Sequence, residues 1–178
     1  AECIVEQAEA WAMSRGATPL FVDLASIYWY WGEKYGVRPD VAYAQSAKET
    51  GFGRFGGVVD RSFCNWCGLK TKDGGANDDP EAHAKFPSDV VGVKAHLQHL
   101  CRYAGHPLPE GEEVVDPRYH LVTPGVATTV EDLGGRWAPS KDYGKSVRAY
   151  LDSLLAWKDI EAYYREVAEE DVTCQRCA

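Results

Sequence analysis

The sequence predicts an α+β fold that is predominantly helical, arranged as a single domain over residues 1–178 with a central irregular lobe. Two observations support this prediction. In several segments, apolar residues recur every three or four positions between helix start and stop signals. Residues 51–87 lack this periodicity and are rich in Gly, Asp and Asn, so we expect a long loop with a short hairpin near residues 65–75. A loop of this length in a compact domain is usually functional.

Three helices are expected before the loop. Residues 2–15 place apolar side chains on one face, and a glycine follows as a stop signal. A proline opens each of the next two helices, at residues 19–35 and 39–49. The aromatic run IYWYW at residues 27–31 has helical spacing, which is more typical of core packing than of a binding site.

The chain after the loop is expected to form further helices joined by an irregular connector. A serine caps a helix with a buried apolar seam over residues 88–104, and the connector, residues 106–125, contains four prolines. The sequence TVED at residues 129–132 resembles a capping box that starts a short helix. Ser140 is the predicted cap of a long helix, and a charged helix is expected over residues 159–170.

Composition narrows the function classes. The chain has 178 residues, 45% of them hydrophobic and 26% charged, as in ordinary soluble globular proteins. The net charge of −8 and the lack of a basic run argue against a dedicated nucleic-acid binder, and no apolar run reaches membrane-spanning length. We therefore expect neither nucleic acid nor membrane as a partner. The first ten residues are not an intact signal peptide, although a segment removed before Ala1 would leave the same sequence.

Six cysteines leave three states open. Four of them form the pairs CNWC and CQRC, and the other two are Cys3 and Cys101. Two such pairs could supply a four-thiolate zinc site, but over a hundred residues separate them, far more than in a compact zinc module. Structural disulfides would require an oxidising compartment. Reduced thiols rank first among these interpretations, disulfides second and zinc third.

A single carboxylate stands where a predicted helix ends. In the stretch AQSAKETGFGRFGG, residues 44–57, Glu49 lies in the last helical turn, where unpaired carbonyl groups disfavour negative charge. Phe52 and Phe55 follow and supply apolar walls. Both effects raise the pKa of a carboxyl group. A carboxylic acid that keeps its proton near neutral pH can protonate the leaving oxygen in glycoside cleavage.

The alternative is a surface glutamate followed by an ordinary glycine C-cap, and spacing alone favours that alternative. The composition of the loop that follows favours the catalytic interpretation. Its aromatic faces could pack on sugar rings, and its Asn and Asp side chains could bond hydroxyl and acetamido groups.

Several motifs carry a family resemblance in the right order. AQSAKETGFGRFGG resembles the catalytic-glutamate motif of the bacterial N-acetylglucosaminidase family, the peptidoglycan hydrolases found in autolysins, flagellar muralytic proteins and phage endolysins. NWCGLK, residues 65–70, is similar to that family's Asn-x-x-Gly-Ile-Lys segment. AHAKFPSDVVGVKAHLQHL and DLGGRWAPSKDYGKSV resemble its later segments, so the resemblance spans residues 20–155. It implies a lysozyme-like helical core with a small, mobile β-containing lobe over the cleft.

The resemblance also assigns candidate site residues. Glu49 matches the general acid, and Tyr143 matches the family's active-site tyrosine. The implied substrate-binding residues are Gln45, Phe52, Phe55, Asn65, Trp66, Lys70 and Trp137. Phe55 and Trp66 are candidates for stacking on sugars, although either could belong to the core. Many family members have a second acid in the mobile lobe, and the candidates here, Asp78, Asp79 and Glu81, have solvated loop charges as their alternative interpretation.

The implied activity is that of an endo-β-N-acetylglucosaminidase, which cleaves the GlcNAc-β-1,4-MurNAc bond of peptidoglycan glycan strands. We expect a monomer that needs no metal and no cofactor, secreted or associated with the cell wall, or released at lysis if phage-encoded. Because the net charge is negative, contacts with an anionic wall must be short-range, or another module must supply the targeting. Attack by the substrate's own 2-acetamido oxygen, or a distant base in the mobile loop, is favoured over a double-displacement carboxylate.

Three other functions stay open at this point. A muramidase or lytic transglycosylase of the same fold class would also use a single glutamate. A non-catalytic wall-binding module would keep the cleft without the chemistry. A thiol enzyme would pair Cys64 or Cys67 with a histidine, although nothing in the sequence places those groups together.

Overall fold

The computed structural model describes residues 1–157, which are predominantly helical. The α-helices are α1 (Val5–Ser14), α2 (Pro19–Tyr35), α3 (Pro39–Thr50), α4 (Asp89–Ala104) and α5 (Tyr143–Leu155). Short 3-10 turns lie in the long connections: η1 (Arg61–Phe63), η2 (Pro80–Ala82), η3 (Tyr119–Leu121) and η4 (Glu131–Leu133). The predicted helices up to α4 are confirmed with small shifts of their ends, whereas the helix predicted over residues 159–170 lies outside the described residues.

Start and stop signals in the sequence bound α2, α3 and α4. The hydroxyl of Thr18 accepts a hydrogen bond from the backbone N–H of Phe21 at the start of α2, and Ser88 does the same for Val91 at the start of α4. A glycine in the left-handed region follows the last residue of each of these helices. Gly51, with φ +56°, ends α3 and so leaves its last turn next to an open loop.

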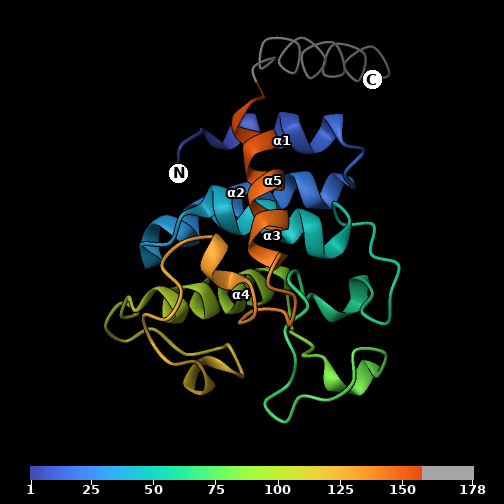
Figure 1. Ribbon diagram of the computed structural model, residues 1–178. Helices are drawn as coiled ribbons and strands as arrows, with labels where there is room; N and C mark the ends of the chain where they lie inside the picture. Colours follow the sequence, from blue (N-terminus) through green and yellow to red (C-terminus); the bar gives the residue numbers. More distant parts are fainter. Residues whose placement is uncertain (158–178) are drawn as a thin grey trace.

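Helix α2 lies at the centre of the helical part. It packs against α1, α3 and α4, and α3 packs in turn against α5. In Figure 1, α5 crosses the direction of α1, α2 and α3, and the two long connections extend from the same side of the bundle as α4. The aromatic run in α2 is confirmed mainly as packing, since Tyr28 is fully buried and Trp29 nearly so, while Tyr30 is exposed.

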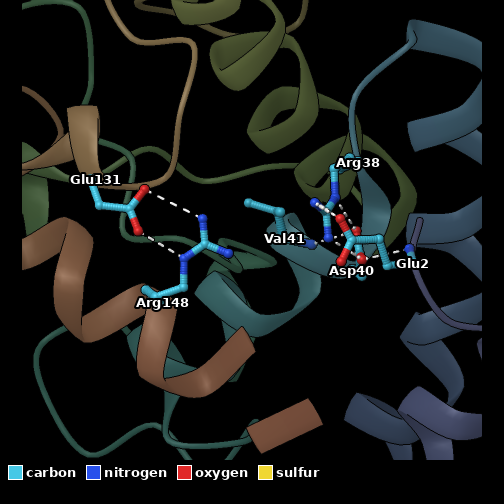
Figure 2. A network of polar contacts seen from close by, with 6 residues as sticks. All are labelled: Glu2, Arg38, Asp40, Val41, Glu131 and Arg148. Atoms are coloured by element: carbon cyan, nitrogen blue, oxygen red, sulfur yellow. Dashed lines mark hydrogen bonds and ion pairs between the residues drawn. The ribbon is translucent and has the colours of Figure 1, made fainter. Parts of the chain in front are cut away.

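Ion pairs fix the start of α3 and the middle of α5 (Figure 2). The buried carboxylate of Asp40 accepts hydrogen bonds from the guanidinium of Arg38 at 2.7 and 3.1 Å and from the backbone N–H of Glu2 at 2.8 Å. Burial acts to raise the pKa of Asp40, but these hydrogen bonds outweigh burial and hold the pKa below its usual value. Arg148 donates to Glu131 at 2.8 and 3.3 Å and so links α5 to η4.

The close approach of α5 to η4 depends on a glycine. A Cβ at Gly144 would lie 2.5 Å from the carbonyl oxygens of Val130 and Glu131, so no larger residue fits there. The capping box at the start of this segment is confirmed, because the hydroxyl of Thr129 accepts from the N–H of Asp132 at 3.3 Å and the Asp132 carboxylate accepts from the N–H of Thr129 at 3.0 Å. This support sets the position of the first turn of α5.

The start of α5 differs from the prediction. Ser140 does not cap the helix, which begins at Tyr143. The hydroxyl of Ser140 instead accepts from the N–H of Asp142 at 3.2 Å, within the turn that leads into the helix. Tyr143 is therefore the first helical residue, and its side chain projects from the N-terminal turn of α5.

The sequence predicts a β-containing lobe with a hairpin near residues 65–75, and this prediction is wrong. In the described chain, residues 51–88 contain η1, η2 and a single antiparallel bridge, between Lys70 and His83. The pairing does not extend, because glycines at positive φ interrupt one side and the proline that opens η2 interrupts the other. The helical core remains consistent with the lysozyme-like expectation.

Candidate active site

A cleft of about 1010 Å³ opens between the end of α3 and the two long connections. Its wall includes residues 48–49 of α3, parts of the connection over residues 67–83, and parts of residues 118–143 up to the start of α5. Two residues of α4, His99 and Tyr103, complete it. The loop that the sequence predicts to be functional therefore forms one side of this cleft.

Glu49 lies on the cleft wall in the last turn of α3, where the sequence predicts it. Its carboxylate is partly buried, and its Oε1 accepts a hydrogen bond from the hydroxyl of Tyr143. The two residues are 94 positions apart in sequence, and the crossing of α5 over α3 brings them together. The structure thus joins the two residues to which the family resemblance assigns the catalytic roles.

The surroundings of Glu49 favour its protonated form. Burial raises the pKa of Glu49, and the hydrogen bond from Tyr143 and the charge of Lys48 oppose that rise only in part. The ammonium of Lys48 lies 4.8 Å from the centre of the Tyr143 ring, on the same side of the cleft. The direction agrees with the argument from sequence, and its largest cause is the removal of the carboxyl group from water.

A chain of buried hydrogen bonds runs from Tyr143 into the core. The side-chain amide of Gln45 donates from Nε2 to the Tyr143 hydroxyl at 2.8 Å, and Nε2 of His96 lies 3.0 Å from Oε1 of Gln45. Nδ1 of His96 lies 2.9 Å from the hydroxyl of Tyr28. Because Gln45 presents its carbonyl oxygen to the ring, His96 carries its hydrogen on Nε2 and accepts at Nδ1. The hydrogen of the Tyr143 hydroxyl is then left to Glu49.

The members of this chain are neutral groups. Gln45 and His96 are fully buried, and burial lowers the pKa of His96 to about 3. Burial also raises the pKa of Tyr28 and of Tyr143 above the usual value. The chain therefore keeps one protonation state over ordinary pH, and Gln45 and His96 act as positioning residues for Tyr143.

The second oxygen of Glu49 lies beside a residue without a side chain. A Cβ at Gly68 would stand 3.9 Å from Oε2 of Glu49, and Gly68 lines the cleft. The backbone of Gly68 has φ +70°, a conformation that favours glycine. No side chain of Gly68 therefore occupies the space next to Oε2.

Two of the predicted substrate-binding residues, Lys70 and Trp137, line the cleft. The ring of Trp137 is partly exposed and packs against His99, with ring centroids 4.9 Å apart. Its other contacts are with His96 and Tyr103, so α4 supports the ring from behind. Stacking of Trp137 on a sugar stays a prediction that this placement permits.

The other five lie outside the cleft wall: Gln45, Phe52, Phe55, Asn65 and Trp66. Trp66 is completely buried, Phe52 is nearly so, and Phe55 packs on Trp66. Trp66 and Phe52 complete the core next to the end of α3, so their assignment to sugar binding is corrected. Phe55 is partly exposed, and its assignment stays a prediction. Asn65 is also buried and bonds the backbone on both sides of its loop, and Gln45 contacts Tyr143 instead of the cleft.

The candidate second acids, Asp78, Asp79 and Glu81, are exposed and do not line the cleft. Asp79 caps η2 by accepting from the N–H of Glu81 at 2.9 Å, and Glu81 lies 3.8 Å from Lys85. These contacts match the alternative interpretation as solvated loop charges. Of the residues that line the cleft, Glu49 alone carries a carboxylate.

Several residues of the cleft wall are not among the predicted substrate-binding residues. His99 and Arg118 line the cleft. Nδ1 of His99 lies 2.7 Å from the buried carboxylate of Asp116, which does not itself line the cleft. Asp116 and Arg118 come from the proline-rich connector, which has no periodicity from which to predict their position. His96 and His99 did carry a signal, because residues three apart on a predicted helix are neighbours on its surface.

The thiol and metal alternatives gain no support from the described residues. Cys3, Cys64, Cys67 and Cys101 are free thiols, and burial raises the pKa of both Cys64 and Cys67, which disfavours a thiolate nucleophile. Within residues 1–157, no group of three or more His, Cys, Asp or Glu side chains could hold a metal ion. The second CxxC pair lies outside this part of the chain.

Within residues 1–157, no helix has the length and apolar character needed to cross a bilayer.

Comparison with known sequences decides the family. Residues 25–173 match the Glucosaminidase family, described as mannosyl-glycoprotein endo-beta-N-acetylglucosaminidase. The chain belongs to the Glucosaminidase family. The match covers both Glu49 and Tyr143, and it confirms the resemblance inferred from the motifs.

This Glucosaminidase-family chain is also similar to an uncharacterized protein of Borreliella burgdorferi. The two are 37% identical over 124 residues, which is 70% of this chain and 58% of the relative. The chain therefore spans less than two thirds of the length of that relative. No solved structure matches it.

Proposed function

We propose that this Glucosaminidase-family protein is an endo-β-N-acetylglucosaminidase of peptidoglycan, with Glu49 as the general acid that cleaves the GlcNAc-β-1,4-MurNAc bond. One observation carries the proposal. The carboxyl group of Glu49 stands in a large cleft, with Oε1 bonded to Tyr143 and Oε2 beside Gly68, and burial raises its pKa. A carboxylic acid so placed can hold a proton and has room to donate it.

In the first step, Oε2 of Glu49 donates its proton to the glycosidic oxygen while the bond between that oxygen and C1 of GlcNAc breaks. The negative charge that develops on Glu49 is then stabilised by the hydroxyl of Tyr143 and by the nearby ammonium of Lys48. Both interactions are stronger with the carboxylate than with the neutral acid. They therefore favour the transition state over the ground state.

A second carboxylate for double displacement would have to stand about 5–5.5 Å from Glu49. Since Glu49 is the one carboxylate among the residues that line the cleft, attack on C1 by the 2-acetamido oxygen of the same sugar accounts better for the second step. Water then opens the resulting ring, and the Glu49 carboxylate takes a proton from that water. This transfer returns Glu49 to its acid form.

We also propose a substrate, an oligomeric state and a location for the enzyme. Its substrate would be peptidoglycan glycan strands, and it would act as a monomer that is secreted, associated with the cell wall, or released at lysis if phage-encoded. Membership of the Glucosaminidase family supports a glycan-hydrolase function of this kind.

The test is Glu49→Gln, assayed on purified peptidoglycan. Loss of the general acid should lower the rate by at least about 10²-fold. Products of the wild-type protein should carry a GlcNAc reducing end, which borohydride reduction and mass analysis would identify. A fully active variant would remove Glu49 from its role. An anhydromuramic end would indicate a lytic transglycosylase instead, and a MurNAc reducing end a muramidase.

The matched control is Glu33→Gln. Glu33 also lies in the last turn of its helix, with a left-handed glycine following at Gly36, but it is exposed and outside the cleft. The control should keep wild-type activity, and both variants should keep wild-type helicity by circular dichroism. A comparable fall in both variants would indicate a general effect of the substitution on the fold.

A further inference from the structure

The cleft wall carries a charge opposite to that of the whole protein. The chain has a net charge of −8, yet Glu49 is the one carboxylate among the residues that line the cleft. Four permanent cations line it: Lys48, Lys70, Arg118 and Arg136. The wall is therefore cationic even when Glu49 is ionised, and more so when Glu49 holds its proton.

These cations are held in place without being neutralised. Within residues 1–157, none of the four forms an ion pair with a carboxylate, whereas seven other lysines and arginines there do. Arg118 donates to two backbone carbonyls of residues 71–72, at 2.8 and 3.3 Å, and Arg136 donates to the carbonyl of Asp132 at 2.9 Å. Carbonyls orient a guanidinium while its charge and remaining N–H groups stay available.

The two arginines approach the cleft beside one tyrosine of α4. The hydroxyl of Tyr103 donates to the backbone carbonyl of Arg136 at 3.1 Å. Burial raises the pKa of Tyr103, and the charges of Arg118 and Arg136 both oppose that rise. Tyr103 and both arginines line the cleft, so the second connection contributes two guanidinium-bearing residues to its wall.

We infer that this wall binds a carboxylate carried by the sugar strand, so that the cleft selects an anionic glycan over a neutral one. The inference rests on the proposed function and adds a substrate class to it. Arginine is well suited to carboxylates, because its planar N–H groups match their geometry. In peptidoglycan such a carboxylate is either the lactyl carboxyl group of MurNAc, where the stem peptide is absent, or a carboxyl group of the stem. Neutral polymers of GlcNAc offer neither.

The experiment compares three forms of one glycan. They are peptide-bearing strands, strands stripped of their stems by an amidase, and stripped strands whose lactyl carboxylates have been converted to methylamides with a carbodiimide. The wild-type kcat/KM should be about 5-fold higher on at least one carboxylate form than on the methylamide. This advantage should shrink as salt is raised, because screening weakens charge attraction. The better of the two carboxylate forms identifies its source.

Arg118→Gln should lower the ratio of kcat/KM on the preferred carboxylate form to that on the methylamide by about 5-fold. Arg54→Gln is the matched control, because Arg54 also donates to two backbone carbonyls, at 2.8 and 3.1 Å, but lies outside the cleft. The control should keep the wild-type ratio. If Arg118→Gln does not fold, the exposed Arg136 provides a second variant, Arg136→Gln, with the same expected effect.

Two failures are distinguishable in this design. Cleavage of all three forms with equal efficiency would overturn the inference and leave the proposed function standing. No cleavage of any form by the wild-type protein would overturn the proposed function itself. An unchanged ratio in both arginine variants would also overturn the inference.

Discussion

Substitution of Tyr143 by Phe tests the contact between α5 and the end of α3. The change removes one hydroxyl group, which accepts from Gln45 at 2.8 Å and donates to Glu49. Both partners are largely or fully buried, so water replaces these hydrogen bonds poorly. The ring itself remains, and the packing of α5 on α3 should be preserved.

The expected effect on stability depends on the charge of Glu49. Loss of the neutral hydrogen bond to Gln45 should lower the free energy of unfolding by about 1 kcal/mol, and loss of a hydrogen bond to an ionised carboxylate by about 1.5–3 kcal/mol more. A total near 3 kcal/mol corresponds to a fall in Tm of about 6–12 °C for a chain of this size. Below pH 4.5, the usual pKa of a glutamate side chain, Glu49 is protonated in both folded and unfolded states. The hydrogen bond to Glu49 is then a neutral one, and the total loss should fall to about 2 kcal/mol.

The sign of the pH dependence follows from the pKa of Glu49. In the folded wild-type protein this pKa lies above 4.5, and the hydrogen bond from Tyr143 opposes the rise. Without the hydroxyl the folded pKa rises further. The stability difference between the two proteins should therefore grow as pH increases through the interval between the two folded pKa values, and stay constant above it. The alkaline limb of kcat/KM, which reports the protonated acid, should move to higher pH in the variant.

Urea unfolding at several pH values and a pH–rate profile would measure these effects. The control is Tyr150→Phe, because Tyr150 lies on the same helix, its ring stacks on Phe52 and its hydroxyl makes no hydrogen bond within the described residues. Tyr150→Phe should shift neither the free energy of unfolding nor the alkaline limb of kcat/KM. A stability difference that is flat with pH, together with an unmoved limb, would show that Tyr143 does not contact the Glu49 carboxyl group in solution.

Two further substitutions test the supports of the site. His96→Leu removes both ring nitrogens from the buried chain and should lower the free energy of unfolding by about 2–6 kcal/mol by urea denaturation; an effect below 1 kcal/mol would mean that the chain is not formed. Gly92→Ala should lower Tm, with a loss of about 1–3 kcal/mol or more, because its Cβ would lie 1.8 Å from the carbonyl oxygen of Cys64. Gly57→Ala, where a Cβ meets open space, should leave Tm nearly unchanged, and equal shifts in the two variants would contradict the argument.

The helices could be predicted from sequence because local chemistry sets their ends. Thr18 and Pro19 start α2, Ser88 starts α4, and glycines stop both. The start of α5 was misplaced because its position is set by tertiary packing, with Gly144 resting on the carbonyls of η4. No local signal in the segment itself reports that contact.

The site could be predicted only in part. Glu49 and Tyr143 lie in motifs that a family resemblance can match, and the structure places them together. The aromatic residues after α3 were assigned to sugars because sequence cannot tell a ring that faces a cleft from one that completes a core. Trp66 and Phe52 face the core, where several other rings surround them.

The two arginines of the cleft could not be predicted for a different reason. Arg118 and Arg136 belong to irregular segments, and a whole-chain charge of −8 conceals a local excess of the opposite sign. Only the folded arrangement of the two connections shows which charges are paired with carboxylates and which are not.

Because His96 is buried, its titration does not overlap with that of Glu49. With a pKa of about 3, the imidazole stays uncharged across the whole interval in which the buried acid beside Tyr143 gains or loses its proton. Spectroscopists who follow that interval by NMR should see the signals of this ring hold one tautomer while those of the carboxyl group move. An inflection in a titration curve is often hard to assign when a histidine and a glutamate lie in one site. Here an inflection in this interval is not due to His96.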